Sequence, residues 1–111
     1  MHKLVVVLRS GEAGAALEQG WGERFVPRAE RMPGLRKVVV SRPVGAPGGE
    51  VQVVLLHELF FDDLESLRSA MVSPEGQAAG RALMDLAPGQ VELFFAEHLE
   101  MDLAPSTGGA A

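Results

Sequence analysis

Four short apolar runs, rich in β-branched residues, constrain the fold of this chain more than any other feature. They span residues 3–9, 35–42, 51–61 and 91–101. Runs of this length and composition predict β-strands. Patterns typical of amphipathic helices follow the first run and the third. The predicted order is therefore β-α-β-β-α-β, which is an α+β fold of the ferredoxin-like plait type with a four-stranded antiparallel sheet.

The apolar character of each run agrees with its place in that plait. The first and third runs are apolar on both faces, which predicts central strands. The second run carries Arg36, Lys37 and Arg42 around a valine-rich centre, a pattern typical of an edge strand. The plait itself places its first and third strands in the centre, so the two arguments agree.

Caps and breakers set the expected bounds of the helices. In the first helical segment an apolar residue recurs every four positions from Ala13 to Ala29, and Pro27 predicts a kink or a restart. Asp62 is the predicted cap of the next helix. Ser73-Pro74 then predicts the start of a further helix, with serine as its cap and proline in its first turn.

Length and composition limit the class of protein. The 111 residues predict one domain at residues 1–103 and a flexible tail at 104–111, which is rich in Pro, Ser, Thr, Gly and Ala. The absence of cysteine excludes a disulfide framework, a thiolate nucleophile and a Cys-ligated metal. The longest unbroken aliphatic run, Leu4 to Leu8, is too short for a membrane span. We therefore expect a cytoplasmic protein with no membrane partner.

Charge is divided unevenly along the chain. Residues 1–42 hold eight basic and four acidic side chains, and residues 43–111 hold two basic and eleven acidic ones, for a net charge of −5. This acidic balance argues against nucleic acid as a partner. Two readings of the asymmetry stay open: complementary neighbours within one fold, or a basic partner-binding face in the first half.

The third strand predicts an assembly. Its alternation places large apolar residues on both faces of the sheet, whereas the helices of a plait cover only one face. An apolar face of that size is expected to be covered, and a second copy of the chain is the simplest cover. We therefore expect a homodimer.

Several short segments, taken together, resemble the EthD family of the dimeric α+β barrel superfamily. They are Trp21 with Phe25-Val26-Pro27, then Pro33-Gly34-Leu35, then Phe61-Asp62-Asp63-Leu64 and Ser73-Pro74-Glu75-Gly76, and the likeness spans residues 2–101. The resemblance implies a two-sheet dimer with a small apolar pocket between the sheet and the helices of each subunit. The superfamily includes monooxygenases, cyclases, isomerases and decarboxylases that act on small, often aromatic or polyketide, molecules.

One position departs from the family pattern. Family members often carry a histidine four residues after the tryptophan and two before the proline, where this chain has Phe25. Phenylalanine cannot carry a proton, so any chemistry must use another residue.

His57 is the candidate that the sequence favours. It lies late in the third strand, on the face shared with Leu55 and Leu59, where apolar surroundings perturb a pKa. Two roles stay open for it: a satisfied core or dimer-contact histidine, or a pocket acid/base or substrate hydrogen-bonding group. Glu58 is expected to point to the opposite face. We expect no metal, because His2, His57 and His98 are not spaced as metal ligands are in a helix. A guessed register between the first and fourth strands places His2 opposite His98 at one end of the sheet.

The predicted pocket has an aromatic lining. Trp21 and Phe25 lie on one helical face, with Phe94 or Phe95 opposite, and Met32, Met71 and Met84 are candidates for a pliable wall. The predicted substrate-binding set is Trp21, Phe25, Met32 and Phe94, and core packing is the alternative for each. Arg24 and Arg28 are placed either at the pocket mouth, to meet a carboxylate, or on a solvated face.

Two functions follow from these predictions. In the first, a homodimeric, cofactor-independent enzyme of oxygenase, cyclase or isomerase type acts on small aromatic or polyketide-like molecules, with His57 as its acid/base. In the second, the dimer is a ligand-binding or accessory protein that has lost the family histidine at Phe25. No cofactor motif and no nucleophile elbow is present, so we expect no cofactor.

Overall fold

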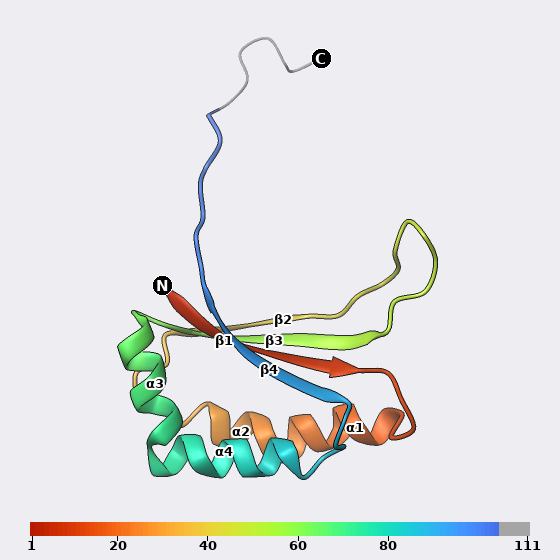
Figure 1. Cartoon of the computed structure of the whole chain (residues 1–111), viewed down its shortest axis with the longest axis horizontal. Helices are drawn as coiled ribbons and strands as arrows, with labels where there is room; N and C mark the ends of the chain where they lie inside the picture. The colour runs from red at the N-terminus through yellow and green to blue at the C-terminus, as the bar shows by residue number, and fades with distance from the viewer. Residues whose placement is uncertain (105–111) are drawn as a thin grey trace.

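The computed structural model describes residues 1–104 and confirms the plait (Figure 1). One antiparallel sheet has the strand order β2-β3-β1-β4. Its strands are β1 (His2–Arg9), β2 (Lys37–Ser41), β3 (Val53–Phe61) and β4 (Val91–Glu97). The central pair is therefore β1 and β3, as their doubly apolar sequences predict. Residues 105–111, which make up most of the expected tail, lie outside the described residues.

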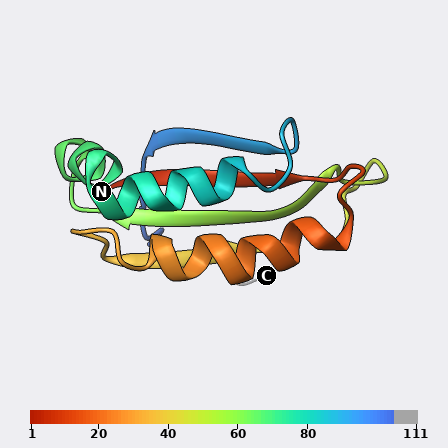
Figure 2. The ribbon, with the colours of Figure 1, turned by 90° about the horizontal axis from the view of Figure 1, so that it is seen from below.

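The helices cover one face of this sheet. They are α1 (Ala15–Gly20), η1 (Trp21–Phe25), α2 (Val26–Ala29), α3 (Leu64–Val72) and α4 (Pro74–Met84). The first three run on without a break as one rod, and α4 lies beside that rod under the sheet (Figure 2). We call the line of contact between these two rods the seam.

The expected irregularity at Pro27 takes the form of a π-helical turn. The η1 segment has i→i+5 geometry and ends one residue before α2, which carries Pro27 in its first turn. A proline cannot donate to the helix and its ring crowds the carbonyl four residues earlier. The wider turn accommodates this, and π turns of this kind often occur at functional sites.

At the corner between α3 and α4, one predicted helix cap is confirmed and another is wrong. Ser73 Oγ accepts a 3.0 Å hydrogen bond from the amide of Gly76, so serine caps α4 as expected. Asp63, and not Asp62, caps α3 by accepting from the amide of Ser66 at 2.7 Å. Asp62 instead pairs with Arg36, and α3 begins one residue later than the cap prediction placed it, at Leu64.

The hydrophobic core lies between the sheet and the helices. Register places Leu4, Val6 and Leu8 of β1 beside Leu59, His57 and Leu55 of β3 on the face that meets the helices. The helices add a second buried layer to this face: Leu17, Trp21, Phe25, Ala29, Leu67, Ala70, Ala79 and Leu83. His57 is the one polar residue that is buried among the described residues.

The register of β4 differs from the guess made on the sequence. His2 lies opposite Glu97, and His98 passes beyond the end of β1, where its amide donates to the carbonyl of Met1. The predicted pairing of His2 with His98 is therefore wrong by one residue. The strands are also shorter than predicted, since β2 begins at Lys37, β3 begins at Val53 and β4 ends at Glu97.

The face of the sheet that points away from the helices is left open. Val5 and Val7 of β1 lie here, beside Leu56 and Phe60 of β3 and Phe94 of β4. Residues 98–104 leave β4 on the same side and project away from the body (Figure 1). Leu99, Met101 and Leu103 in this segment are 78%, 88% and 89% exposed. None of the helices in residues 1–104 has the length and apolar content that a membrane crossing requires.

Candidate functional site

His57 lies inside the fold, on the helix-facing side of a central strand. It is opposite Val6 of β1 and Val40 of β2, and only 2% of its surface is exposed. The alternation argument that placed it with Leu55 and Leu59 is confirmed. A polar residue at this depth needs a hydrogen-bond partner, since burial without one is unfavourable.

Trp21 supplies that partner. Its indole Nε1 donates a 3.0 Å hydrogen bond to Nδ1 of His57. The two rings meet edge to face at 5.2 Å, and Phe25 makes a second edge-to-face contact with the imidazole at 5.7 Å. Both aromatic residues belong to η1, so the π turn presents two rings, four positions apart, to one histidine.

This geometry fixes the protonation state of the imidazole. Burial lowers the pKa of His57 from 6.5 to about 4, so the ring is neutral near pH 7. Because Nδ1 accepts from Trp21, the single ring proton must reside on Nε2. No other group of residues 1–104 hydrogen-bonds to Nε2. The site thus offers a neutral N–H donor, with no spare lone pair for proton abstraction.

A small apolar cavity lies between α4 and the sheet, and Phe25 is the residue that it shares with the surroundings of His57. Its volume is about 10 Å³, the least that a single water molecule needs, so the walls are nearly closed. Of the predicted binding residues, Phe25 and Met32 line the cavity, whereas Trp21 and His57 do not. The other lining residues are Leu4, Met71, Gly76, Ala79, Gly80, Leu83 and Leu93.

Phe94 does not join these residues. It lies opposite Val5 on the open face of the sheet, while Leu93 lies opposite Val6 on the helix-facing side. A shift of one residue in register moves a side chain to the other face, and the β1–β4 register guessed from the sequence was one residue off. Sequence reasoning missed Leu93 for that reason. It also did not assign Leu4, Gly76, Ala79, Gly80 or Leu83 to the cavity.

The remaining histidines take no part in the site. His98 lies on the open face, where its Nδ1 is 3.2 Å from Lys3 Nζ and its ring meets Phe60 edge to face. Lys3 also forms an ion pair with Glu58, which points away from His57 as expected. In residues 1–104 no three His, Cys, Asp or Glu side chains gather in a way that could hold a metal ion.

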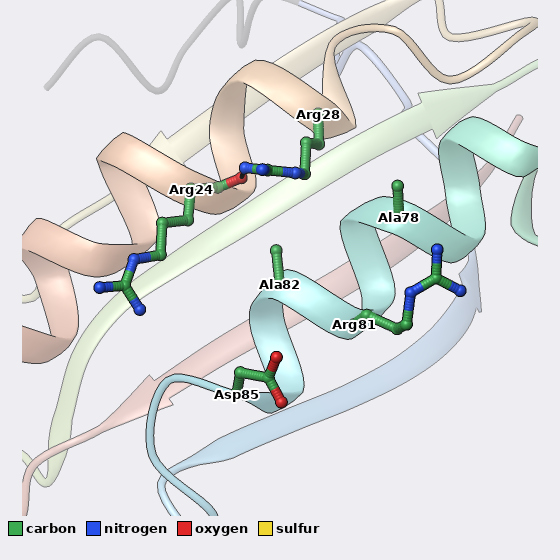
Figure 3. A pocket seen from close by; sticks show the side chains of 6 residues that line it. All are labelled: Arg24, Arg28, Ala78, Arg81, Ala82 and Asp85. Carbon is green, nitrogen blue, oxygen red and sulfur yellow. Dashed lines mark hydrogen bonds between the residues drawn. The ribbon is translucent and has the colours of Figure 1, made fainter.

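The predicted arginines lie on the outer side of the helical layer. Arg24 and Arg28 line a hollow of about 310 Å³ between the first helical rod and α4, together with Ala78, Arg81, Ala82 and Asp85 (Figure 3). Arg28 Nη1 donates a 2.6 Å hydrogen bond to the carbonyl of Arg24. The hollow is open to solvent, and the wall of the helical seam separates it from the apolar cavity.

The fold and its buried histidine define a ferredoxin-like α+β protein with a candidate small-molecule site. No family model matches the chain. The crystal structure of an ethyl tert-butyl ether D (EthD) family protein from Bacillus halodurans is 34% identical, with a TM-score of 0.83, over 89% of this chain and 99% of that one. The chain therefore belongs to the EthD family, which confirms the resemblance.

Two further relatives place the chain more broadly. An uncharacterized 11.0 kDa protein of the thcB–thcC intergenic region of Rhodococcus erythropolis is 23% identical over 97 residues, covering 87% of this chain and 94% of its own length. SnoaB, a cofactor-independent oxygenase from Streptomyces nogalater, is 17% identical, with a TM-score of 0.63, over 90% of this chain and 94% of that one. At that identity SnoaB supports the fold alone.

Proposed function

We propose that this protein is a homodimer that takes a small apolar or aromatic molecule between its sheet and its helices. In this proposal His57 binds the molecule through a hydrogen bond from Nε2 to an oxygen of the ligand. The observation that carries it is the bond from Trp21 Nε1 to His57 Nδ1, which leaves Nε2 as a neutral donor. Phe25, which packs against the His57 ring, also lines the apolar cavity. Buried polar groups of this kind fix the orientation of a ligand in an otherwise apolar pocket.

The proposed role of His57 is narrower than the one predicted from sequence. A general base needs a free lone pair within reach of the proton that it removes. Here the lone pair on Nδ1 is engaged by Trp21, so a donor role is better supported than proton abstraction. A donor in a dry site stabilises negative charge that develops on a carbonyl or phenol oxygen.

The cavity must open for a ligand to bind. Its closed volume is too small for an aromatic ring, but two of its walls are the flexible side chains of Met32 and Met71. Gly76 and Gly80 add no side chains to the opposite wall. Pliable thioethers facing glycines are a wall that can rearrange without a change in the fold.

Homodimer formation is supported by the open face of the sheet. Its apolar residues Val5, Val7, Leu56, Phe60 and Phe94 surround the ion pair of Lys3 with Glu58. Three exposed apolar side chains project from residues 98–104 on the same side. A second copy, packed sheet against sheet, covers both features at once. Solved proteins of this fold from Bacteroides fragilis and Jannaschia are described as dimeric, at 18% identity each.

Catalysis of the cofactor-independent oxygenase, cyclase or isomerase type is one outcome of such a site. In that case the His57 donor stabilises an enolate or phenolate oxygen of the bound molecule. Binding without turnover is the second candidate, and it has an observation of its own in its favour. All side chains lining the cavity are apolar, and Phe25 occupies the position where the family often has histidine.

A matched pair of ligands tests the donor role. 1-Tetralone and tetralin share a shape, but only the ketone offers an oxygen to Nε2. We expect the ketone to bind about fivefold more tightly, the value of one hydrogen bond of about 1 kcal/mol. His57→Gln keeps a donor near the Nε2 position and should retain the difference, whereas His57→Leu should abolish it. Equal affinities of both ligands for the wild type would contradict the proposal.

Native mass spectrometry of the protein purified from cells tests the assembly and the occupancy. A mass twice 11.8 kDa, with or without a small bound molecule, supports the homodimer, and a monomer at micromolar concentration contradicts it. Oxygen uptake and new product masses with 1-tetralone or 1-naphthol, measured against the His57→Leu variant, separate turnover from binding.

A further inference from the structure

Three of the eight arginines of this protein each pair with a carboxylate: Arg9 with Glu92, Arg36 with Asp62 and Arg42 with Glu18. The other five form no ion pair with any residue of 1–104, and three of these five, Arg24, Arg28 and Arg81, lie at the seam between the two helical rods. The guanidinium groups of Arg24 and Arg81 point away from each other (Figure 3), so a ligand that binds all three arginines requires these flexible side chains to turn towards it.

These three arginines surround a hollow. Arg24 and Arg28 come from the first rod, and Arg81 from α4, while Ala78 and Ala82 form a floor of small side chains (Figure 3). Asp85 is the acidic member of the lining, so the hollow keeps a net charge of about +2 at neutral pH. A site with this charge attracts an anion.

The hollow and the apolar cavity are lined by chain neighbours on the same two helical rods. On the first rod Arg24 lines the hollow and Phe25 lines the cavity, and on α4 Ala78 lines the hollow and Ala79 lines the cavity. The two spaces therefore lie on different faces of the same pair of helices.

The first rod is irregular beside these two spaces. Phe25 belongs to the π turn η1, and π turns of this kind often occur at functional sites. Gly22 of this turn and Gly80 of α4 both leave open space, since a Cβ added at either position would meet no atom within 4 Å.

We propose that this seam is the mouth of the cavity, and that the ligand carries a carboxylate on its small apolar body. The carboxylate binds to Arg24, Arg28 and Arg81, and the apolar body passes Phe25 into the cavity. A planar guanidinium matches a carboxylate with two parallel hydrogen bonds, and free inorganic phosphate lacks the apolar body that the cavity binds. This inference rests on the proposed small-molecule function and adds the chemical class of its ligand.

A second matched pair of probes tests it. 3-Phenylpropanoate and 3-phenylpropan-1-ol differ only in the terminal group, and their three-carbon chain can span the seam. The chain has one tryptophan, so its indole N–H gives a single NMR signal that reports on the His57 side of the cavity. Titrating each probe against that signal yields both dissociation constants.

We expect 3-phenylpropanoate to bind at least tenfold more tightly than the alcohol. Arg24→Gln combined with Arg81→Gln should remove this preference while leaving the affinity for the alcohol unchanged. Arg68→Gln, which removes an exposed arginine of α3 away from the hollow, is the matched control and should change neither constant. Phosphate at tenfold excess should compete only weakly.

The possible failures are distinct. Equal affinities for the two probes, or a preference that survives the double variant, overturn the carboxylate mouth and leave the cavity proposal standing. Strong competition by inorganic phosphate overturns the assignment to carboxylates. If neither probe moves the indole signal, the proposed cavity function fails, and this inference fails with it.

Discussion

Trp21 Nε1 donates a 3.0 Å hydrogen bond to His57 Nδ1, although the two residues are 36 positions apart in the chain. This bond joins the π turn of the helical layer to a central strand of the sheet. It satisfies the buried histidine, fixes its tautomer and holds the indole edge-on to the imidazole at 5.2 Å. Packing and the chemistry of the site therefore depend on the same contact.

Trp21→Phe should destabilise the protein through this bond. The ring volume is partly kept, but Nδ1 of His57 loses its donor and becomes an unsatisfied buried acceptor. We expect a loss of about 1–3 kcal/mol in the free energy of unfolding, measured by urea denaturation followed by circular dichroism.

A double-mutant cycle with His57→Leu isolates the bond from the lost volume. With no imidazole to satisfy, Trp21→Phe should cost clearly less in the His57→Leu background than in the wild type. Equal costs in the two backgrounds would show that the hydrogen bond contributes nothing.

Stability should fall in acid because of His57. Burial lowers the pKa of His57 in the folded state to about 4, while the unfolded chain titrates near 6.5. Below pH 6.5 the unfolded chain takes up a proton that the folded chain does not, so stability is full above pH 6.5 and is lost towards pH 4. The expected loss by pH 4 is about 3 kcal/mol.

Urea denaturation between pH 7.5 and 4, repeated with His57→Gln, measures that loss. Ion pairing with arginine lowers the pKa values of Asp62 and Glu92, and a cap bond lowers that of Asp63, so these carboxyls also destabilise the fold in acid. These carboxyls act equally in both proteins, so their effect cancels when the free energy of unfolding of His57→Gln is subtracted from that of the wild type. If this difference does not change with pH, a neutral buried His57 is contradicted.

Much of the fold was predictable because most of its elements are encoded by local sequence patterns. The doubly apolar runs identified β1 and β3 as central, and Ser73-Pro74 identified the start of α4. The bounds that failed depend on neighbours. Predicted β4 ran to Met101, but the strand ends at Glu97, which lies opposite His2, the first residue of β1.

The site was predictable only where alternation within one strand was sufficient. His57 and its face followed from the pattern of β3 alone. Phe94 was misplaced because its face depends on the register between β1 and β4, which no local pattern records. The hydrogen bond from Trp21 to His57 could not be predicted either, because it depends on a π turn that brings Trp21 and Phe25 against a strand distant in the sequence.

Gly76→Ala should destabilise the corner between α3 and α4. A Cβ at Gly76 would lie 2.0 Å from the carbonyl oxygen of Ala70, so the two helices would have to separate. We expect a loss of at least about 2 kcal/mol in the free energy of unfolding. Gly80→Ala is the control in the same helix, because a Cβ there meets nothing within 4 Å and alanine favours helix by about 1 kcal/mol. Similar effects of the two substitutions would argue against a tight corner.

Phe94→Lys should break the proposed homodimer. Phe94 is 49% exposed and lies on the open face of the sheet, so a second copy would bury it, and a buried lysine without a partner is strongly unfavourable. Val72→Lys is the control, since Val72 is 71% exposed on the helical side and should leave the assembly unchanged. Sedimentation velocity over a range of concentrations measures both. If Phe94→Lys sediments as the wild type does, sheet-to-sheet packing is wrong, and the apolar residues 99–103 must be covered in another way.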